Sequence, residues 1–252
     1  MTDIPQDHPR YRSLSTRHRI VSGVDNGITS LEGLIAQGRG EAFDYLIGED
    51  TLSSARAAEY TAAAMILLAK RPVISVNGNA AALVPEELVQ LSDKTGAPLE
   101  VNLFYRTQER VLNIIKHLQV HGAREVLGAE PDATIPGLSS QRNNVCQSGI
   151  FSADVVFVPL EDGDRCEALV KMGKQVIAVD LNPLSRTAQK ATVTIVDNII
   201  RAVPNIIEMI GELQGKDNDY LQGIVSGFDN QKGLAHALDS IIRHLSDIKG
   251  PH

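Results

Sequence analysis

From Pro72 onward, short runs of β-branched and other apolar residues alternate with stretches whose apolar positions recur at helical spacing. The runs cover residues 73–76, 99–104, 125–127, 154–160, 175–181 and 193–197. Runs that are apolar on both faces are typical of parallel strands covered by helices on both sides. The pattern therefore predicts an α/β fold, doubly wound around a mostly parallel sheet.

Two of the segments between these runs have clear helix signals. Apolar side chains share one helical face over residues 111–118, and Gly122 follows as a natural C-terminal cap. A shorter helix is expected to begin near Asp164 and to end at Gly173.

The N-terminal third predicts three helices. The first covers about residues 9–24, Thr29 and Glu32 have capping-box spacing at the start of the second, and an Ala-rich third covers residues 51–70. The tail from Asn198 is expected to be mostly helical, with an interruption around residues 215–227.

These elements predict one compact domain over residues 1–252. It would comprise N-terminal helices (1–71), the α/β core (72–200) and C-terminal helices (201–252). No repeat, low-complexity tract or Pro/Ser-rich linker divides the chain.

Composition narrows the class of function. The 24 Lys and Arg against 31 Asp and Glu give a net charge of −7, and aromatic residues make up only 4% of the chain, which argues against a nucleic-acid binder. No uncharged run approaches the ~20 apolar residues that span a bilayer, and the polar N-terminus has no signal-peptide pattern. We expect a cytoplasmic protein without a membrane segment, in which Cys146 and Cys166 are ordinary small residues.

The loops after the predicted strands are the first places to look for chemistry, because ligands of open parallel sheets bind at the carboxyl ends of the strands. Asn77-Gly78-Asn79 follows one run. It could present amide groups and backbone N–H donors to an anion, or simply form a tight turn, for which Asn and Gly are the usual residues.

Two charged residues follow the run at 175–181. Asp180 could accept hydrogen bonds from ribose hydroxyls, or act as a turn or helix-cap residue. Arg186 is placed to reach a phosphate as a fork-shaped donor, or to lie in solvent.

Other charged segments are ambiguous. Gln37-Gly38-Arg39-Gly40-Glu41 could bring a guanidinium against a ligand or be a plain connector between helices. Arg10, Arg12, Arg17 and Arg19 fit a solvated helix face. The acidic segment 161–165 could hold Mg²⁺ or form an exposed turn, and the turn is favoured.

Three absences exclude common activities. The sequence has no GxxxxGK[ST], no GxGxxG after a strand and no GxSxG. A chain that uses ATP would therefore belong to neither the P-loop nor the standard dinucleotide-binding type.

Several longer strings are distinctive, among them ITSLEGLIAQGRGEAFDYLIGE, PVISVNGNAAALVP, LEVNLFYRT, FVPLEDGDR and AVDLNPLSRTA. Together they resemble the archaeal phosphopantothenate synthetases, also called 4-phosphopantoate:β-alanine ligases. The resemblance covers residues from about Ile4 to about Met209.

The resemblance implies a Rossmann-like core and a homodimeric enzyme of coenzyme A biosynthesis. Such an enzyme joins the carboxylate of 4-phosphopantoate to the amine of β-alanine and converts ATP to AMP and pyrophosphate, with Mg²⁺ bridging the phosphates. The positions that match the family's ATP ligands are Arg17, Arg39, Asp180, Leu181, Asn182, Arg186, Thr187, Asn198 and Ile199. Arg39 and Arg17 are the candidates for stabilising the transition state.

The acid-binding residues are expected among Asn77, Gly78, Asn79, Arg106 and Arg165, and no dedicated metal ligand is assigned. Two alternatives remain open from the residues. A nucleotide-binding sensor would share the fold without turnover, and a nicotinamide oxidoreductase would need the glycine motif that is missing.

Overall fold

The computed structural model describes residues 4–249, so the ends of the predicted domain, residues 1–3 and 250–252, lie outside the described residues. Six strands form one sheet in the order β3-β2-β1-β6-β7-β8, and every neighbouring pair is parallel. Their bounds are Pro72–Val76 (β1), Leu99–Val101 (β2), Val126–Leu127 (β3), Val155–Pro159 (β6), Gln175–Val179 (β7) and Val193–Ile195 (β8). The predicted α/β fold, doubly wound around a parallel sheet, is confirmed. The strand order reverses between β1 and β6, which makes this the switch point of the sheet.

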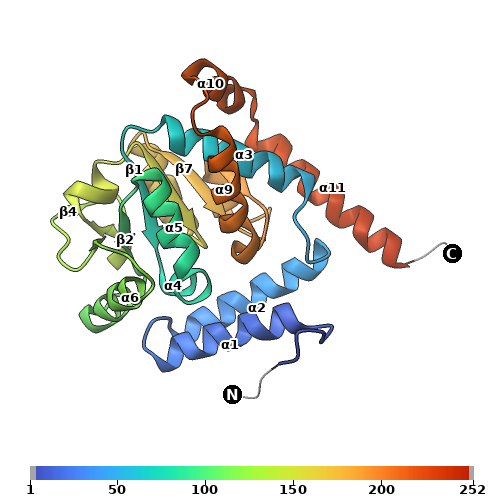
Figure 1. Cartoon of the computed structure of the whole chain (residues 1–252), viewed down its shortest axis with the longest axis horizontal. Helices are drawn as coiled ribbons and strands as arrows, with labels where there is room; N and C mark the ends of the chain where they lie inside the picture. Colours follow the sequence, from blue (N-terminus) through green and yellow to red (C-terminus); the bar gives the residue numbers. More distant parts are fainter. Residues whose placement is uncertain (1–3, 250–252) are drawn as a thin grey trace.

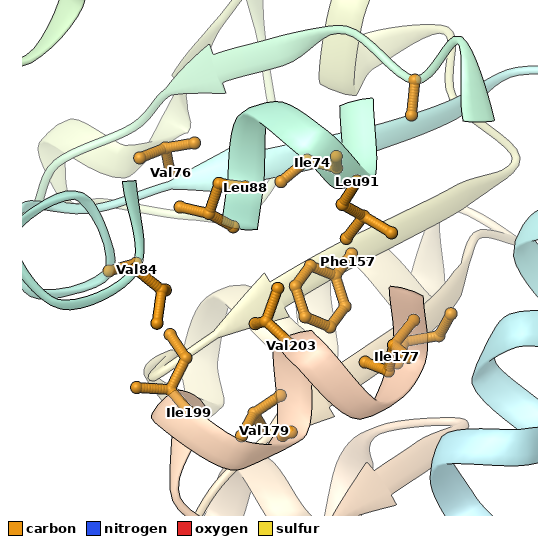
Figure 2. Packing of buried hydrophobic residues seen from close by; sticks show 14 of the residues in the cluster. Ile74, Val76, Val84, Leu88, Leu91, Phe157, Ile177, Val179, Ile199 and Val203 are labelled. Atoms are coloured by element: carbon orange, nitrogen blue, oxygen red, sulfur yellow. The ribbon is translucent and has the colours of Figure 1, made fainter. Parts of the chain in front are cut away.

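Both faces of the sheet are buried, as the apolar runs predict. Along β6, Val156 and Phe157 are almost fully buried but belong to different clusters, because successive side chains of a strand point to opposite faces. Val176 and Ile177 of β7 alternate in the same way. Figure 2 shows the cluster around Phe157, where side chains of the sheet meet those of two helices.

Helices cover one face of the sheet almost entirely. They are α3 (Ser53–Leu68), α4 (Gly78–Leu83), α5 (Pro85–Thr95), α6 (Gln108–Val120) and α9 (Ile199–Leu213). The other face is covered by α7 (Gly163–Lys171) and α8 (Arg186–Lys190) together with an irregular segment. The helices predicted at 51–70, 111–118 and 164–173 are confirmed within a few residues.

The irregular segment contains a two-stranded antiparallel hairpin, β4 (Ala133–Thr134) with β5 (Asn144–Val145), and a π-helical turn over Gln147–Phe151. The sequence analysis missed all three, because this stretch has no periodic pattern. A buried carboxylate of β2 organises it: Glu100 accepts hydrogen bonds from the backbone N–H groups of Cys146 (2.8 Å) and Ile150 (2.6 Å). A Cβ atom at Gly149 would lie 2.0 Å from Oε2 of Glu100, so only glycine fits there.

Two N-terminal helices, α1 (Tyr11–Asp25) and α2 (Leu31–Leu46), lie side by side at one end of the molecule (Figure 1). The predicted capping box at Thr29 and Glu32 is wrong, because Ser30 is the residue that precedes α2. The hydroxyl of Thr29 donates instead to the side-chain oxygen of Asn79. Thr29 therefore ties the N-terminal helices to the core.

The C-terminal part adds α10 (Asn218–Gly227) and α11 (Asn230–Lys249) to α9. The interruption predicted around residues 215–227 is wrong for most of its length, because only residues 214–217 separate α9 from α10. Asp217 caps α10 by accepting from the N–H of Tyr220 (2.8 Å). The far half of α11 projects from the body of the molecule (Figure 1), and none of the described helices is long and apolar enough to cross a membrane.

Candidate active site

A cavity of about 560 Å³ lies at the carboxyl ends of the strands, across the switch point. This volume is typical of small-molecule sites. One wall, the β7–β8 wall, consists of residues 180–182, 185–187 and 198–199, and the opposite end, the β2 end, carries Tyr105 and Arg110. The loops after β1 and β6 lie between them, and α2 contributes residues from Glu32 to Phe43 as a roof.

Asp180 shapes the loop after β7. One of its carboxylate oxygens accepts from the backbone N–H of Asn182 (2.9 Å) and the other from the hydroxyl of Ser185. Burial raises the pKa of Asp180. Ser185 also caps α8 by accepting from the N–H of Ala188 (3.0 Å). Asp180 lines the cavity, but it serves as a turn residue at the same time, so both readings of the sequence describe it.

Arg186 and Thr187, which follow Ser185, differ in the exposure of their side chains. Arg186 lines the cavity with a guanidinium that is 59% exposed, and it pairs with Asp164 and with Glu167 (2.6 Å) of α7. The hydrogen bond from Arg186 lowers the pKa of Glu167 to about 2. Thr187 is buried and donates its hydroxyl to the carbonyl of Glu161 (2.9 Å). This bond joins the loops after β6 and β7.

Asn198 caps α9 at the end of the β7–β8 wall. Its side-chain amide donates to Asp44 of α2 (2.7 Å), and its backbone N–H donates to Asp197 (2.7 Å). Arg201 then pairs with both carboxylates, with Nη2 at 2.6 Å from Asp44 and 2.5 Å from Asp197. These bonds hold the loop after β8 against α2.

A fully buried carboxylate lies behind this loop. Glu59 of α3 accepts from the side-chain amide of Asn205 (3.0 and 3.1 Å). Burial raises the pKa of Glu59 to about 8, and Asp197 contributes to the shift. Asn205 also donates to the hydroxyl of Thr51 (3.4 Å), which in turn donates to Asp197 (2.6 Å). We call Asp44, Glu59, Asp197 and Arg201 the β8 cluster.

Arg39 lines the cavity, but not from a connector. The expectation that Gln37-Gly38-Arg39-Gly40-Glu41 joins two helices is wrong, because these residues lie inside α2. A Cβ atom at Gly40 would lie 3.4 Å from the side chain of Leu181, so this glycine lets α2 pack closely on the loop after β7. The helix places Arg39 near Asp180, whose pKa it acts to lower.

Arg17 does not line the cavity. Its guanidinium forms two hydrogen bonds with Glu41 of α2, from Nε (2.9 Å) and from Nη2 (2.6 Å), and it is 46% exposed. The structure therefore separates Arg17 from Arg39, although both were expected at the same phosphate.

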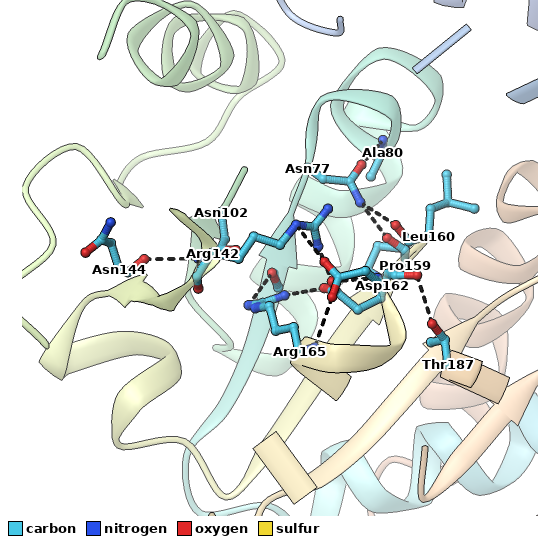
Figure 3. Close-up of polar contacts among 12 residues, drawn as sticks. Asn77, Ala80, Asn102, Arg142, Asn144, Pro159, Leu160, Asp162, Arg165 and Thr187 are labelled. Carbon is cyan, nitrogen blue, oxygen red and sulfur yellow. Dashed lines mark hydrogen bonds and ion pairs between the residues drawn. The ribbon is translucent and has the colours of Figure 1, made fainter. Parts of the chain in front are cut away.

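Asn77, Gly78 and Asn79 border the cavity, yet their polar groups have structural partners. Asn77 accepts from the N–H of Ala80 (2.9 Å) and donates to the carbonyl of Pro159 (2.7 Å) across the switch point (Figure 3). Asn79 donates to the carbonyl of Gly33 (3.0 Å) and accepts from Thr29. These three residues line the cavity as expected, and the side-chain amides of Asn77 and Asn79 make internal hydrogen bonds there.

Gly78 explains why these three residues lie so close to the N-terminal helices. A Cβ atom at this position would lie 2.5 Å from the carbonyl oxygen of Ile28 and 2.9 Å from the Cα of Thr29. Only glycine allows the two backbones to approach this closely. We call residues 77–79 with their partners the 77–79 hub.

Arg165 does not reach the cavity. Its side chain is fully buried, pairs with Glu161 and donates to the hydroxyl of Ser75 (3.1 Å) (Figure 3). Arg142 pairs with the same glutamate, and its Nε lies 3.2 Å from Asp162. Burial acts to raise the pKa of Glu161, but the two guanidinium groups outweigh it and hold that pKa below its usual value. We call Arg142, Glu161, Asp162 and Arg165 the β6 cluster.

Arg106 also points elsewhere. Its Nη2 donates to the carbonyls of Gly128 (2.6 Å) and Ala129 (3.4 Å), outside the cavity wall. The expectations that Arg106 and Arg165 bind substrate directly are therefore corrected: one binds a neighbouring loop and the other a buried glutamate.

Tyr105, Arg110 and Arg142 are among the cavity residues that the sequence pattern did not single out. Arg110 could have been found, since it lies in the first turn of the helix that follows β2, where a long side chain reaches back to the strand end. Arg142 follows an aperiodic stretch that carries no such signal.

The remaining candidates are structural. The exposed turn predicted for 161–165 is wrong, because residues 163–165 begin α7 and the side chains of Glu161 and Arg165 are buried. Asp162 caps α7 by accepting from the N–H of Arg165 (2.9 Å). Between residues 4 and 249 no group of three or more His, Cys, Asp or Glu side chains is arranged to hold a metal ion. Cys146 and Cys166 are buried free thiols, and burial raises the pKa of Cys166 to about 12.

Comparisons with known proteins agree with this architecture. Residues 54–244 match the model of the phosphopantothenate/pantothenate synthetase family. A protein from Methanosarcina mazei named 4-phosphopantoate--beta-alanine ligase is 56% identical over 245 residues, which cover 97% of this chain and 96% of the relative. Proteins of the same name from Thermococcus kodakarensis (52% identical; 98% and 94% covered) and Methanospirillum hungatei (49% identical; 97% and 99% covered) are also similar. With a family match over most of its length and relatives at about half identity or more, the chain belongs to the phosphopantothenate/pantothenate synthetase family.

Proposed function

We propose that this protein is an ATP-dependent ligase that condenses 4-phosphopantoate with β-alanine to 4′-phosphopantothenate, releasing AMP and pyrophosphate, in coenzyme A biosynthesis. The observation that carries the proposal is the cavity at the switch point, in a chain whose nearly full-length relatives are named for this activity. A site that holds two polyanions, ATP and 4-phosphopantoate, needs cationic side chains, and Arg39, Arg110, Arg142 and Arg186 line this cavity.

ATP binds at the β7–β8 wall in this proposal. Asp180 accepts hydrogen bonds from the ribose hydroxyls, and Arg186 with Thr187 holds the phosphates. Support comes from the placement of all three residues in one wall. Leu181, Asn182, Asn198 and Ile199 complete the nucleotide site, and they line the same wall.

The reaction passes through an acyl adenylate. A carboxylate oxygen of 4-phosphopantoate attacks the α-phosphorus of ATP, and pyrophosphate leaves. The amine of β-alanine then attacks the acyl carbon. AMP leaves with the electron pair of the C–O bond that joined it to the acyl group. The amine has a pKa of about 10 and must first lose a proton.

Arg39 stabilises the charge that develops on the α-phosphate. The support for this role is that α2 holds Arg39 in the cavity roof near Asp180. Arg17 remains a proposed ATP contact, but it must leave Glu41 to reach the nucleotide.

Mg²⁺ would offset the phosphate charges and be held mainly by the phosphates themselves. Within the cavity wall Asp162 suits such an ion best. Its Oδ2 is buried and accepts no hydrogen bond from a described residue, although it lies 3.2 Å from Nε of Arg142.

A homodimer is the proposed assembly, and residues 1–252 are the proposed single domain. Support for one domain is a buried cluster that runs from Ile20 of α1 to Leu221 of α10. Support for self-association is a set of exposed apolar side chains on α2 and α11, namely Leu31, Ile35, Ile242, Leu245 and Ile248.

Incubation with ATP, Mg²⁺, β-alanine and 4-phosphopantoate labelled with ¹⁸O in its carboxylate tests the proposal. We expect AMP and pyrophosphate to form only when both acids are present, with one labelled oxygen in AMP. Label in orthophosphate, with ADP as the coproduct, would contradict the adenylate. ATP binding without turnover would indicate a nucleotide sensor instead.

A further inference from the structure

One arginine of the cavity has neither a role in the proposed nucleotide site nor an ion-pair partner. Arg39 and Arg186 belong to the proposed nucleotide site, and the charge of Arg142 is balanced within the β6 cluster. The remaining cation is Arg110, at the β2 end. Neither the family resemblance nor the sequence pattern provided a role for it.

Although the negative charge of Glu32 acts on it from beyond ion-pair distance, Arg110 has no directly bonded counterion among the described residues. It donates to two neutral acceptors, the carbonyl of Tyr105 and the carbonyl of Ile28 (3.3 Å). Among residues 4–249, no carboxylate oxygen lies within 4.0 Å of its nitrogens. Its Nε is buried and has no hydrogen-bond partner in the described part of the chain. Burial lowers the pKa of Arg110, which means that the protonated side chain is poorly solvated where it lies.

The guanidinium is also held in place. Thr107 caps α6 by accepting from the backbone N–H of Arg110 (3.2 Å), which fixes the first turn of this helix. A Cβ atom at Gly78 would lie 3.2 Å from Nη2, so the side chain rests against the glycine of the 77–79 hub. A fixed, poorly solvated cation in a cavity wall favours an anionic ligand, because the ligand supplies the missing charge without reorganising the site.

The position of Arg110 indicates which anion this is. The strand order places β2 and the proposed nucleotide loops of β7 and β8 on opposite sides of β1 and β6. The carboxylate of 4-phosphopantoate must meet the α-phosphate of ATP, so its own phosphate points away from the nucleotide. The β2 end is the part of the cavity that remains for that phosphate.

We propose that Arg110 binds the phosphate of 4-phosphopantoate and thereby discriminates the phosphorylated acid from pantoate. This inference rests on the proposed function and replaces Arg106 and Arg165 as the expected phosphate donors. When the phosphate is missing, Arg110 stays buried without a counterion, so pantoate loses binding energy.

The test compares kcat/KM for 4-phosphopantoate with kcat/KM for pantoate in the parent and in variants. Arg110→Met should lower this ratio roughly 10- to 100-fold, the range expected when hydrogen bonds to a charged group are lost. Arg110→Lys, which keeps the charge but loses the planar fork, should give an intermediate ratio.

Arg106→Met is the matched control. Arg106 is also half-buried and also donates to two backbone carbonyls, but it lies outside the cavity wall. Its removal should leave the ratio unchanged even if it lowers stability. A parent-like ratio in both Arg110→Met and Arg110→Lys would overturn the role of Arg110. The proposed function would still stand in that case if the parent forms AMP.

A second measurement does not depend on turnover. Calorimetric titration with 4-phosphopantoate, in the presence of α,β-methylene-ATP, should give weaker binding to Arg110→Met than to the parent and to Arg106→Met. Equal affinity for all three proteins would overturn the role of Arg110. If the parent formed no AMP, the proposed function would fall, and this titration would still decide the role of Arg110.

Discussion

The β6 cluster and the β8 cluster hold similar positions but differ in charge. Each lies behind a strand-end loop that lines the cavity. The β6 cluster contains two guanidinium groups and two carboxylates, whereas the β8 cluster contains three carboxylates and one guanidinium. A balanced cluster can stay ionised when buried, but a cluster with an excess of acid must take up a proton or pay for the repulsion.

Burial keeps Glu59 protonated, and the excess of acid in the β8 cluster adds to this effect through Asp197. The pKa of Glu59, about 8, lies well above the ordinary value of 4.5, so the folded state binds a proton that the unfolded chain has released. The contribution of Glu59 to the free energy of unfolding is therefore fully present below pH 4.5, and it is lost as the pH rises towards 8. The central glutamate of the β6 cluster, Glu161, has no such dependence in this range, because its pKa is lowered.

Arg165→Met should have the largest effect on stability. It leaves Glu161 fully buried with one of its two cations, and breaking such a pair typically costs about 3–5 kcal/mol. Urea unfolding at pH 7 measures the loss. The double variant Arg165→Met/Glu161→Gln should recover part of it, and a loss below about 1 kcal/mol in the single variant would show that the cluster does not depend on this pair.

Glu59→Gln should act in the opposite direction. Glutamine keeps an acceptor for Asn205 and needs no proton, so at pH 7 the variant should be more stable than the parent by about 1–3 kcal/mol. The difference should shrink to zero near pH 4.5. Denaturation across this range measures it, with Glu212→Gln on the exposed surface of α9 as the control. Parallel stability curves for parent and Glu59→Gln would refute the protonation.

Asp180→Asn tests a buried carboxylate that serves a ligand as well as a turn. We expect an increase of about tenfold in the KM for ATP, which corresponds to one lost hydrogen bond of about 1.4 kcal/mol. The amide has one acceptor oxygen where the carboxylate has two. Discrimination between ATP and 2′,3′-dideoxy-ATP should fall in the variant. If parent and variant discriminate equally, Asp180 does not contact the ribose.

Arg186→Lys should have the smallest effect on stability. The ion pairs of Arg186 are exposed, and such pairs contribute about 0–1 kcal/mol. The KM for ATP should nevertheless rise, because lysine loses the fork that spans two phosphate oxygens. An unchanged KM and kcat would remove Arg186 from the proposed nucleotide site.

The features of the structure that could be predicted from the sequence are those that depend on local periodicity or on position at the end of a strand. The parallel strands, the helix over 111–118, and the location of Asp180 and Arg186 in the cavity wall all follow from that pattern. The interior position of Arg39 in α2 does not, because two flanking glycines disfavour a helix. Gly40 packs against Leu181, whereas no atom lies within 4 Å of the place of a Cβ atom at Gly38.

Long-range contacts account for features that the sequence pattern did not show. Asn77 and Asn79 have the residue types of a ligand-binding loop, but carbonyls 82 and 46 residues away in the sequence occupy their amides. Arg165 likewise meets Ser75 of a neighbouring strand, 90 residues away. No local signal distinguishes an arginine that binds a substrate from one that pairs with a buried glutamate.

The 77–79 hub also bears on the order in which the chain can fold during synthesis. The N-terminal helices and β1 leave the ribosome first, but the amide of Asn77 needs the carbonyls of Pro159 and Leu160. A nascent chain that ends before these residues can dock α2 on Asn79, yet it cannot complete the floor of the cavity. Contacts of such high sequence separation close slowly because a long loop must be ordered first. The roof depends on residues that are made later still, because α2 contacts Leu181, Asn198 and Arg201, so the pocket can be complete only after the chain has been synthesised beyond Arg201.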